Sequence, residues 1–264
     1  MKRAAMALIV FALAGVSGKV CAQPGDWYSR GIIRQQTIDL IGARQKRQEY
    51  DSYLAKISRL KLLEKARRFT SSRNGNSTRP GDPATGTASS QDTIFHSVEP
   101  SFVPQQLAAR LGTTPQERQY IQGVLTKCLD FYTETARQKG VPLYDVARAL
   151  NYFIVTNYFV YTQGAGPTRA QMEATRDMIR ANMLADETFR GMSDREKQES
   201  YETLIVIAGF VDLGYGTAKH SGNENLAAQF HDMAKHNLET LLGVPVARIH
   251  FTSEGRLSTD TANP

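Results

Sequence analysis

The chain has 264 residues, 41% of them hydrophobic and 22% charged, and a formal net charge of +6. This length is consistent with one domain plus an appendage, and the hydrophobic share is ample for a packed core. The charge is unevenly distributed along the chain. Residues 30–73 hold twelve Lys or Arg and four acidic side chains, whereas residues 91–264 hold sixteen Lys or Arg and twenty acidic side chains. The positive charge therefore belongs to the N-terminal segment, which excludes a basic folded domain.

Residues 1–22 predict a signal peptide. Two basic side chains precede an apolar run over residues 4–16, and small residues lead to Ala22. The run is shorter than the roughly 20 apolar residues that span a bilayer. The residues before Cys21 do not form a lipobox, so we expect cleavage near Ala22 and export to the periplasm or the medium. Cleavage there would remove Cys21 and leave Cys128 without a disulfide partner.

Residues 23–69 predict a basic amphipathic helical segment. Apolar side chains recur at spacings of three and four between Tyr50 and Leu63. The basic face carries Arg59, Lys61, Lys65, Arg67 and Arg68. One interpretation is a solvated face over a stripe packed on the domain or on a second copy. The other is docking on anionic lipid headgroups or an acidic partner, where each Lys or Arg contributes on the order of 1 kcal/mol. Nucleic acid is not an expected partner of an exported protein.

Residues 70–93 are rich in serine, glycine, asparagine and proline, with almost nothing apolar to bury. This composition predicts a disordered linker between the basic segment and the C-terminal domain. We therefore expect the two to reorient relative to one another.

Residues 94–250 predict an all-α bundle of about five helices, followed by a flexible tail over residues 251–264. Four hydroxyl residues stand three positions before a group that can complete a capping box: Thr114 with Glu117, Thr168 with Gln171, Ser193 with Glu196, and Ser221 with Glu224. Pro142 predicts a further helix start, and Gly164 and Gly243 predict helix ends. A short extended segment over residues 246–251 has no evident partner strand.

The apolar run 204–211 predicts a helix buried on every side at the centre of the bundle. Gly209 within it predicts a close helix crossing, because glycine there would otherwise cost about 1 kcal/mol against alanine. Cys128 lies on the apolar face of its predicted helix, which indicates a small buried hydrophobe rather than a nucleophile.

Two polar residues interrupt apolar runs, Asn157 and Asp212. With Tyr161 and Tyr215 they are candidates for a polar network lining an interhelical pocket. The alternative is that Asp212 reaches solvent where its helix ends, and that Asn157 is simply hydrogen-bonded inside the bundle.

Catalytic signals are weak. Glu199 on a predicted helix, followed by Gly214-Tyr215-Gly216 at an expected helix end, resembles lytic transglycosylases, whose single glutamate acts as acid and base. The Gly-Leu-Met-Gln element of those enzymes is missing, and carboxylates near a helix start are common. We expect no cofactor and no metal site.

Several motifs together resemble a known family. They are Pro100-Ser101, Gly140-Val141-Pro142, Asp145-Val146-Ala147 and the segment from Met192 to Gln198. Over about residues 95–242 the chain resembles an uncharacterised family of exported bacterial all-helical proteins, known only as a domain of unknown function. The resemblance implies an all-α exported domain and transfers no activity.

These observations favour an exported interaction protein that binds another cell-envelope component, a protein or an anionic one, through the domain surface, the basic helix or both. The alternative is an envelope enzyme acting on peptidoglycan or a small metabolite through carboxylates, with Glu199 as candidate. A pocket with two converging acids of perturbed pKa would favour the enzyme.

Overall fold

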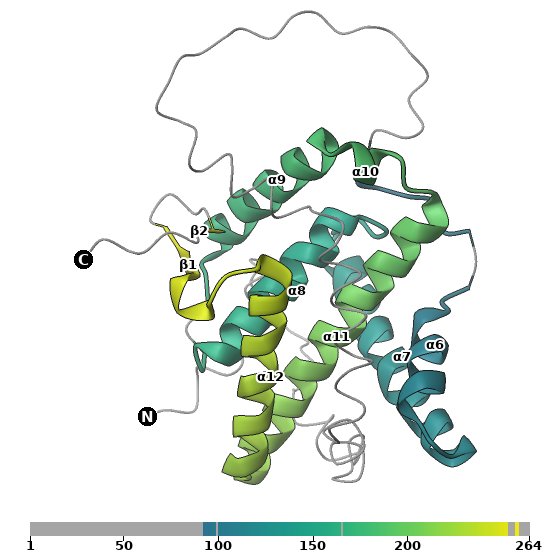
Figure 1. Cartoon of the computed structure of the whole chain (residues 1–264), viewed down its shortest axis with the longest axis vertical. Coiled ribbons are helices and arrows are strands. Elements are labelled where there is room, and N and C mark those ends of the chain that lie inside the picture. Colours follow the sequence, from purple (N-terminus) through teal and green to yellow (C-terminus); the bar gives the residue numbers. More distant parts are fainter. Residues whose placement is uncertain (1–91, 99, 165, 253–256, 259–264) are drawn as a thin grey trace, which may run out of the picture.

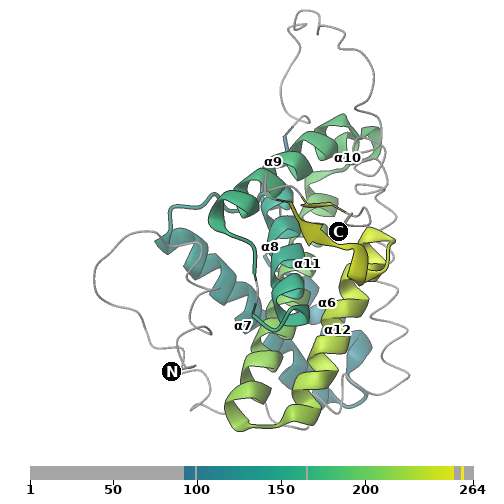
Figure 2. The same cartoon turned by 90° about the vertical axis from the view of Figure 1, so that its left-hand side faces the viewer.

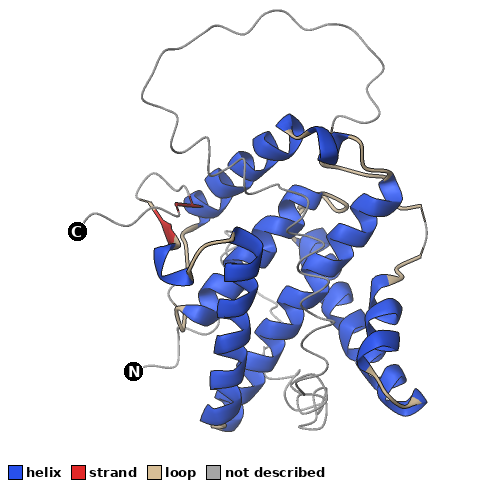
Figure 3. Cartoon of the chain, viewed as in Figure 1, coloured by secondary structure: helices blue, strands red, loops and turns tan. Residues whose placement is uncertain are grey.

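The computed structural model describes residues 92–98, 100–164, 166–252 and 257–258. The predicted signal peptide, the basic segment with its five-residue face, and residues 70–91 of the predicted linker lie outside the described residues. The described part is an all-α bundle, as the sequence predicts (Figure 3).

Seven α-helices, one 3-10 helix and a two-stranded ribbon make up the described part of the chain. They are α6 (Val103–Leu111), α7 (Pro115–Gln138), α8 (Val146–Tyr161), α9 (Arg169–Ala185), α10 (Glu187–Arg190), α11 (Asp194–Ser221), α12 (Glu224–Leu242), η1 (Val246–Arg248), β1 (His250–Phe251) and β2 (Leu257–Ser258). The five long helices α7, α8, α9, α11 and α12 correspond to the five predicted from the sequence.

Helix α11 forms the centre of the bundle, where it packs against α6, α7, α8 and α12 (Figures 1 and 2). Every residue from 204 to 211 is buried, which confirms the prediction drawn from the apolar run. Helices α9 and α10 lie at one end of the bundle in both views.

Gly209 sits at a close crossing of α11 and α7. A Cβ atom added to Gly209 would lie 2.9 Å from the Cβ of Cys128, closer than packed carbon atoms approach. The predicted close approach is confirmed. Burial, with a smaller contribution from the nearby Asp212 charge, raises the pKa of the Cys128 thiol to about 12, so this side chain remains a protonated, buried hydrophobe.

Three of the four predicted capping boxes are present, at Thr114, Thr168 and Ser193. The fourth is wrong, because Ser221 is the last residue of α11. Helix α12 is capped instead by Asn223, whose side-chain oxygen accepts from the Leu226 N–H at 3.1 Å.

The helix start predicted at Pro142 is also wrong, because α8 begins four residues later. Its cap is Asp145, whose carboxylate accepts from the Ala147 N–H at 3.0 Å. The chain reaches this cap through Tyr144, which has a φ of 60°, a conformation that a helix could not contain. A carboxylate cap therefore prevails over the nearby proline.

The described residues before α6 form an N-terminal strap, residues 92–98 and 100–102, that lies on α11. The buried Lys197 donates from Nζ to the Asp92 carbonyl at 3.2 Å. Gln198 accepts from the Val98 N–H at 3.1 Å. Asp92 and the fully buried Thr93, which the sequence places in the linker, are thus held by the fold.

Helix α6 takes its N-terminal cap from α11. The buried Glu202 carboxylate accepts from the Ser101 hydroxyl at 3.1 Å and from the backbone N–H groups of Phe102 and Val103 at 3.1 and 3.0 Å. The residue preceding the helix, Phe102, supplies no side-chain cap of its own. One carboxylate therefore satisfies donors that a helix start leaves open.

The end of the domain contains an antiparallel ribbon. Strand β1 pairs with β2, with His250 opposite Ser258 and Phe251 opposite the buried Leu257. The predicted extended segment therefore does have a partner strand, which lies within the segment expected to be a flexible tail.

Helix α9 holds both chain segments that flank the bundle. Its Arg180 guanidinium pairs with the Asp92 carboxylate at 3.2 Å, and its Gln171 amide donates to the Thr252 carbonyl at 3.0 Å. The chain thus enters and leaves the bundle against the same helix.

Candidate functional site

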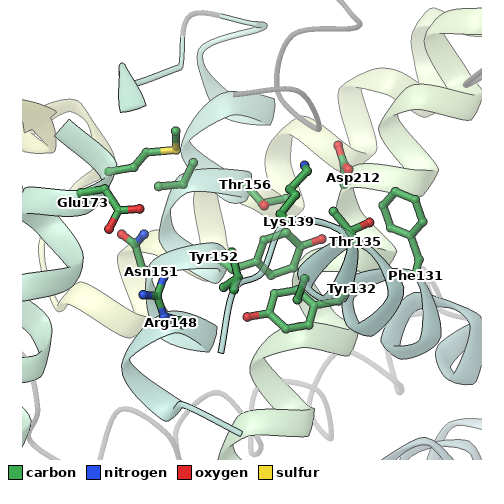
Figure 4. Close-up of a pocket in the computed structure, with 14 residues that line it drawn as sticks. Phe131, Tyr132, Thr135, Lys139, Arg148, Asn151, Tyr152, Thr156, Glu173 and Asp212 are labelled. Carbon is green, nitrogen blue, oxygen red and sulfur yellow. The ribbon is translucent and has the colours of Figure 1, made fainter. Parts of the chain in front are cut away.

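A pocket with a volume of about 80 Å³ lies between α7, α8, α9 and α11 (Figure 4). Its walls are mostly apolar, formed by Phe131, Tyr132, Ala136, Val141, Tyr152, Val155 and Met172. Polar and charged side chains complete it: Thr135, Lys139, Arg148, Asn151, Thr156, Glu173 and Asp212. Many of these residues are half-buried, so the pocket opens to solvent.

Helix α8 contributes one continuous face to the pocket. Arg148, Asn151, Tyr152 and Val155 stand at spacings of three or four, or next to each other, which places them on one side of a helix. Helix α7 faces them with residues 131–139, α9 adds its first turn, and α11 adds Asp212. The site therefore exists only when four helices have assembled.

Two tyrosines form the aromatic wall. The rings of Tyr132 and Tyr152 lie with centroids 5.0 Å apart. Burial raises the pKa of Tyr152 well above its ordinary value, and the nearby Asp212 charge raises it further, whereas a hydrogen bond to the Thr156 side chain acts in the opposite direction. Both hydroxyl groups therefore stay protonated and available as donors at neutral pH.

Asp212 is the unusual charged group of the pocket. It is half-buried, and within the described part of the chain its carboxylate has neither a hydrogen bond nor an ion pair. Burial raises its pKa from 3.8 to about 6. At neutral pH the pocket therefore contains a carboxylate that forms no ion pair with a described side chain, and the cation drawn nearest to it in the close-up is Lys139, another residue of the lining (Figure 4).

Asp212 does not stand at a helix end, contrary to one interpretation of the sequence, since α11 continues to Ser221. The expectation that Gly214-Tyr215-Gly216 marks a helix end is wrong for the same reason. The physical role of Gly214 is packing, because a Cβ atom there would overlap the Phe230 ring of α12.

The other charged groups of the pocket differ from Asp212 in their surroundings. Arg148 pairs with Asp145 at 3.5 Å, and Glu173 pairs with Arg176 at 3.1 Å. Glu173 and Asp212 lie at opposite sides of the close-up (Figure 4). The two acids therefore do not converge on one point as the acid pair of a hydrolase would.

Asn151 supplies a second uncompensated polar group. Its side-chain oxygen is buried and has no hydrogen-bond partner, and it lines the pocket beside Arg148 and Glu173 (Figure 4). Buried polar atoms without partners are rare in folded proteins and call for an explanation.

The four pocket residues predicted from the sequence are not brought together. Asp212 lines the pocket, whereas Asn157, Tyr161 and Tyr215 do not. Asn157 is fully buried and donates to the Phe153 carbonyl at 2.8 Å.

Each of the other three has a packing role elsewhere. The Asn157 oxygen accepts from the Asn237 amide of α12 at 2.8 Å, so it is simply hydrogen-bonded inside the bundle. The Tyr161 ring stacks on His231 with centroids 5.2 Å apart. Tyr215 is buried within α11.

Glu199 does not line this pocket. It lies in the first third of α11, where its carbonyl oxygen accepts from the Thr203 hydroxyl at 2.6 Å. Among the described residues no group of three His, Cys, Asp or Glu side chains is arranged to hold a metal ion. Over the same ranges no helix is both long and apolar enough to cross a bilayer.

Sequence reasoning missed Asn151 and Tyr152 as site residues. The available signal was their position on α8, where Arg148, Asn151 and Tyr152 interrupt an otherwise apolar helix at helical spacing. That spacing identifies one polar face on a helix whose other residues, apart from Tyr158 and Tyr161, are buried.

The fold and the pocket together define an all-α bundle with a partly open aromatic pocket and one uncompensated carboxylate. The chain belongs to a family of unknown function, DUF6683, whose sequence model matches residues 4–259. This match reaches beyond the resemblance over residues 95–242 and includes the basic segment and the linker. No curated protein and no solved structure matches the chain.

Proposed function

We propose that this protein is an exported binding protein that takes a small molecule of the cell envelope into the pocket between α7, α8, α9 and α11. The observation that carries the proposal is Asp212. An ionised carboxylate that is partly withdrawn from water and has no partner destabilises the fold.

A residue that destabilises the fold requires a compensating role. Groups with perturbed pKa values in clefts cluster at functional sites. The surrounding wall has the character of a ligand site, which is mostly apolar with a few polar groups that fix orientation. Asn151 fits the same pattern, since its buried oxygen also lacks a partner. A ligand that satisfies both groups explains both observations.

The test compares ligand retention in two variants of the mature chain, purified from the native envelope and weighed by native mass spectrometry. Thr135 lines the pocket and is half-buried, so Thr135→Trp fills the space with little change to the core. Thr133→Trp, two residues away on α7 and not in the pocket lining, is the matched control. We expect a bound small-molecule mass in the wild type and in Thr133→Trp, and its loss in Thr135→Trp. An identical spectrum for all three proteins would refute the proposal.

The uneven charge of the chain supports a second binding surface. The predicted basic face at Arg59, Lys61, Lys65, Arg67 and Arg68 precedes, in the sequence, a segment over residues 91–264 with an excess of four acidic residues. We propose that this face docks on an anionic envelope component, with no role for nucleic acid. The enzyme alternative has no comparable support, because Glu199 lies away from the pocket and the two pocket acids do not converge.

A further inference from the structure

We propose that the ligand of this pocket is a small organic cation, an ammonium group carried on an apolar body. The inference rests on the proposed function and specifies its chemistry. In this arrangement the charged nitrogen lies against Asp212, and the apolar body lies along Tyr152 and Met172.

The first argument is charge. Four charged residues line the pocket. Arg148 and Glu173 have partners of opposite sign in Asp145 and Arg176, and Lys139 takes part in an interaction of its own. Asp212 has no partner of opposite sign within the described part of the chain. An anionic ligand would add a like charge beside this carboxylate, whereas a cationic ligand would neutralise it.

The second argument is the direction of the missing hydrogen bonds. Three groups of the lining lack a hydrogen bond among the described residues: the Asn151 oxygen and the Asp212 carboxylate, which are acceptors, and the Nε of Arg148, a donor whose charge is paired with Asp145. Of these, only Asp212 carries a charge without an ion-pair partner in the described part of the chain. A carboxylate or phosphate ligand offers only further acceptors. An alkylammonium group offers up to three N–H donors, which is the complement that the Asp212 carboxylate requires. The Asn151 oxygen lies on the Glu173 side of the pocket and would be met by another part of the ligand (Figure 4).

The third argument is the aromatic wall. The rings of Tyr132 and Tyr152 pack together, and Phe131 lies below Asp212 in the close-up (Figure 4). Aromatic faces attract cations, and sites that combine aromatic rings with a carboxylate recognise organic ammonium groups. A volume of about 80 Å³ has room for a chain of several heavy atoms, since one water molecule needs about 10–15 Å³.

The test uses three probes of matched shape, hexylammonium, hexanol and hexanoate, titrated into the full mature chain and followed by calorimetry. We expect hexylammonium to bind at least about tenfold more tightly than hexanol, because a charge-assisted hydrogen bond adds to the same apolar contact. Hexanoate should bind most weakly of the three.

Two isosteric variants test whether Asp212 is the source of the preference for hexylammonium over hexanol. In Asp212→Asn, hexylammonium should lose about tenfold in affinity and hexanol should be unchanged. Asp130→Asn removes one negative charge from the exposed face of α7, outside the pocket lining. It should change neither the affinity for hexylammonium nor the affinity for hexanol. Thr135→Trp should abolish binding of every probe.

The outcomes separate the two proposals. Equal affinities for the three probes, or a preference for hexanoate, with binding still lost in Thr135→Trp, would overturn the cation inference and leave the pocket as a binding site. An ammonium preference that survives in Asp212→Asn would also overturn it. Absence of binding by all three probes, together with no retained mass in the native spectrum, would overturn both.

Discussion

Asp212 links the chemistry of the pocket to the stability of the fold. Its pKa is raised to about 6 by burial, whereas an aspartate in an unfolded chain titrates near 3.8. The folded state therefore holds the proton more tightly than the unfolded state does. The contribution of Asp212 to the free energy of unfolding is therefore greatest below about pH 4, falls as the pH rises towards 6, and stays lower above that range.

We expect Asp212→Asn to stabilise the protein at neutral pH, because the amide carries no charge to bury. Each pKa unit corresponds to about 1.4 kcal/mol, so the gain in the free energy of unfolding at pH 7.5 should be roughly 1–3 kcal/mol. At pH 4 the difference should fall below about 1 kcal/mol. Urea unfolding of both proteins at the two pH values measures it, and a pH-independent difference would show that desolvation of the charge is not the cause.

At the residue scale the sequence supported some conclusions better than others. Cys128 and Gly209 were predictable because each stands on an apolar helical face whose neighbours are visible in the sequence. The burial of Asp212 was not, since it depends on α7 and α8 covering one turn of α11. Asn157 also interrupts an apolar run in the sequence. Its hydrogen bond with Asn237 of α12, which the sequence does not reveal, shows that Asn157 has a structural role.

Among the contacts between helices, the close crossing of α7 and α11 leads to a specific prediction about stability. We expect Gly209→Ala to destabilise the protein by about 1–2 kcal/mol, because overpacking at the Cys128 contact outweighs the gain in helix propensity. Gly123→Ala is the control within α7, where an added Cβ meets nothing within 4 Å, and it should stabilise by about 0.5–1 kcal/mol. Equilibrium urea unfolding compares them, and stabilisation by both would contradict the close crossing.

Helix ends were predictable where the cap is local. The boxes at Thr114, Thr168 and Ser193 each use a partner three residues away, and all three are present. The start of α6 could not be found in this way, because its cap comes from Glu202, 100 residues from Phe102 in the chain. No window of local sequence contains both partners.

The motif at residues 192–198 also has an explanation at this scale. Ser193 and Glu196 form the capping box of α11, and Lys197 and Gln198 bind the strap. The segment that carries much of the family resemblance thus holds the fold together, which is consistent with a resemblance that transfers no activity.

At the scale of the whole molecule, periodic apolar faces were enough to predict an all-α bundle of five long helices. The pocket was beyond such reasoning, because its wall combines residues from four helices and the sequence does not specify their order around α11. Only the polar face of α8 left a local signal.

The uneven charge of the chain leads to a prediction about binding to anionic membranes. Replacing Arg59, Lys61, Lys65, Arg67 and Arg68 by glutamine removes five positive charges from the basic face. Since each contributes on the order of 1 kcal/mol near an anionic surface, we expect binding of the mature chain to anionic liposomes to weaken at least about a hundredfold. Sedimentation with liposomes measures it, and neutral liposomes serve as the control. Unchanged binding would show that another surface docks.

Helix α9 gives the pocket a mechanical connection to the rest of the chain. The helix that contributes Met172 and Glu173 to the pocket also binds the chain before the bundle, at Asp92, and the chain after it, at Thr252. A force applied to either end of the domain is therefore transmitted to α9, the helix that forms one wall of the pocket. Attachment of the protein through its N-terminal segment and occupation of its pocket therefore both act on α9.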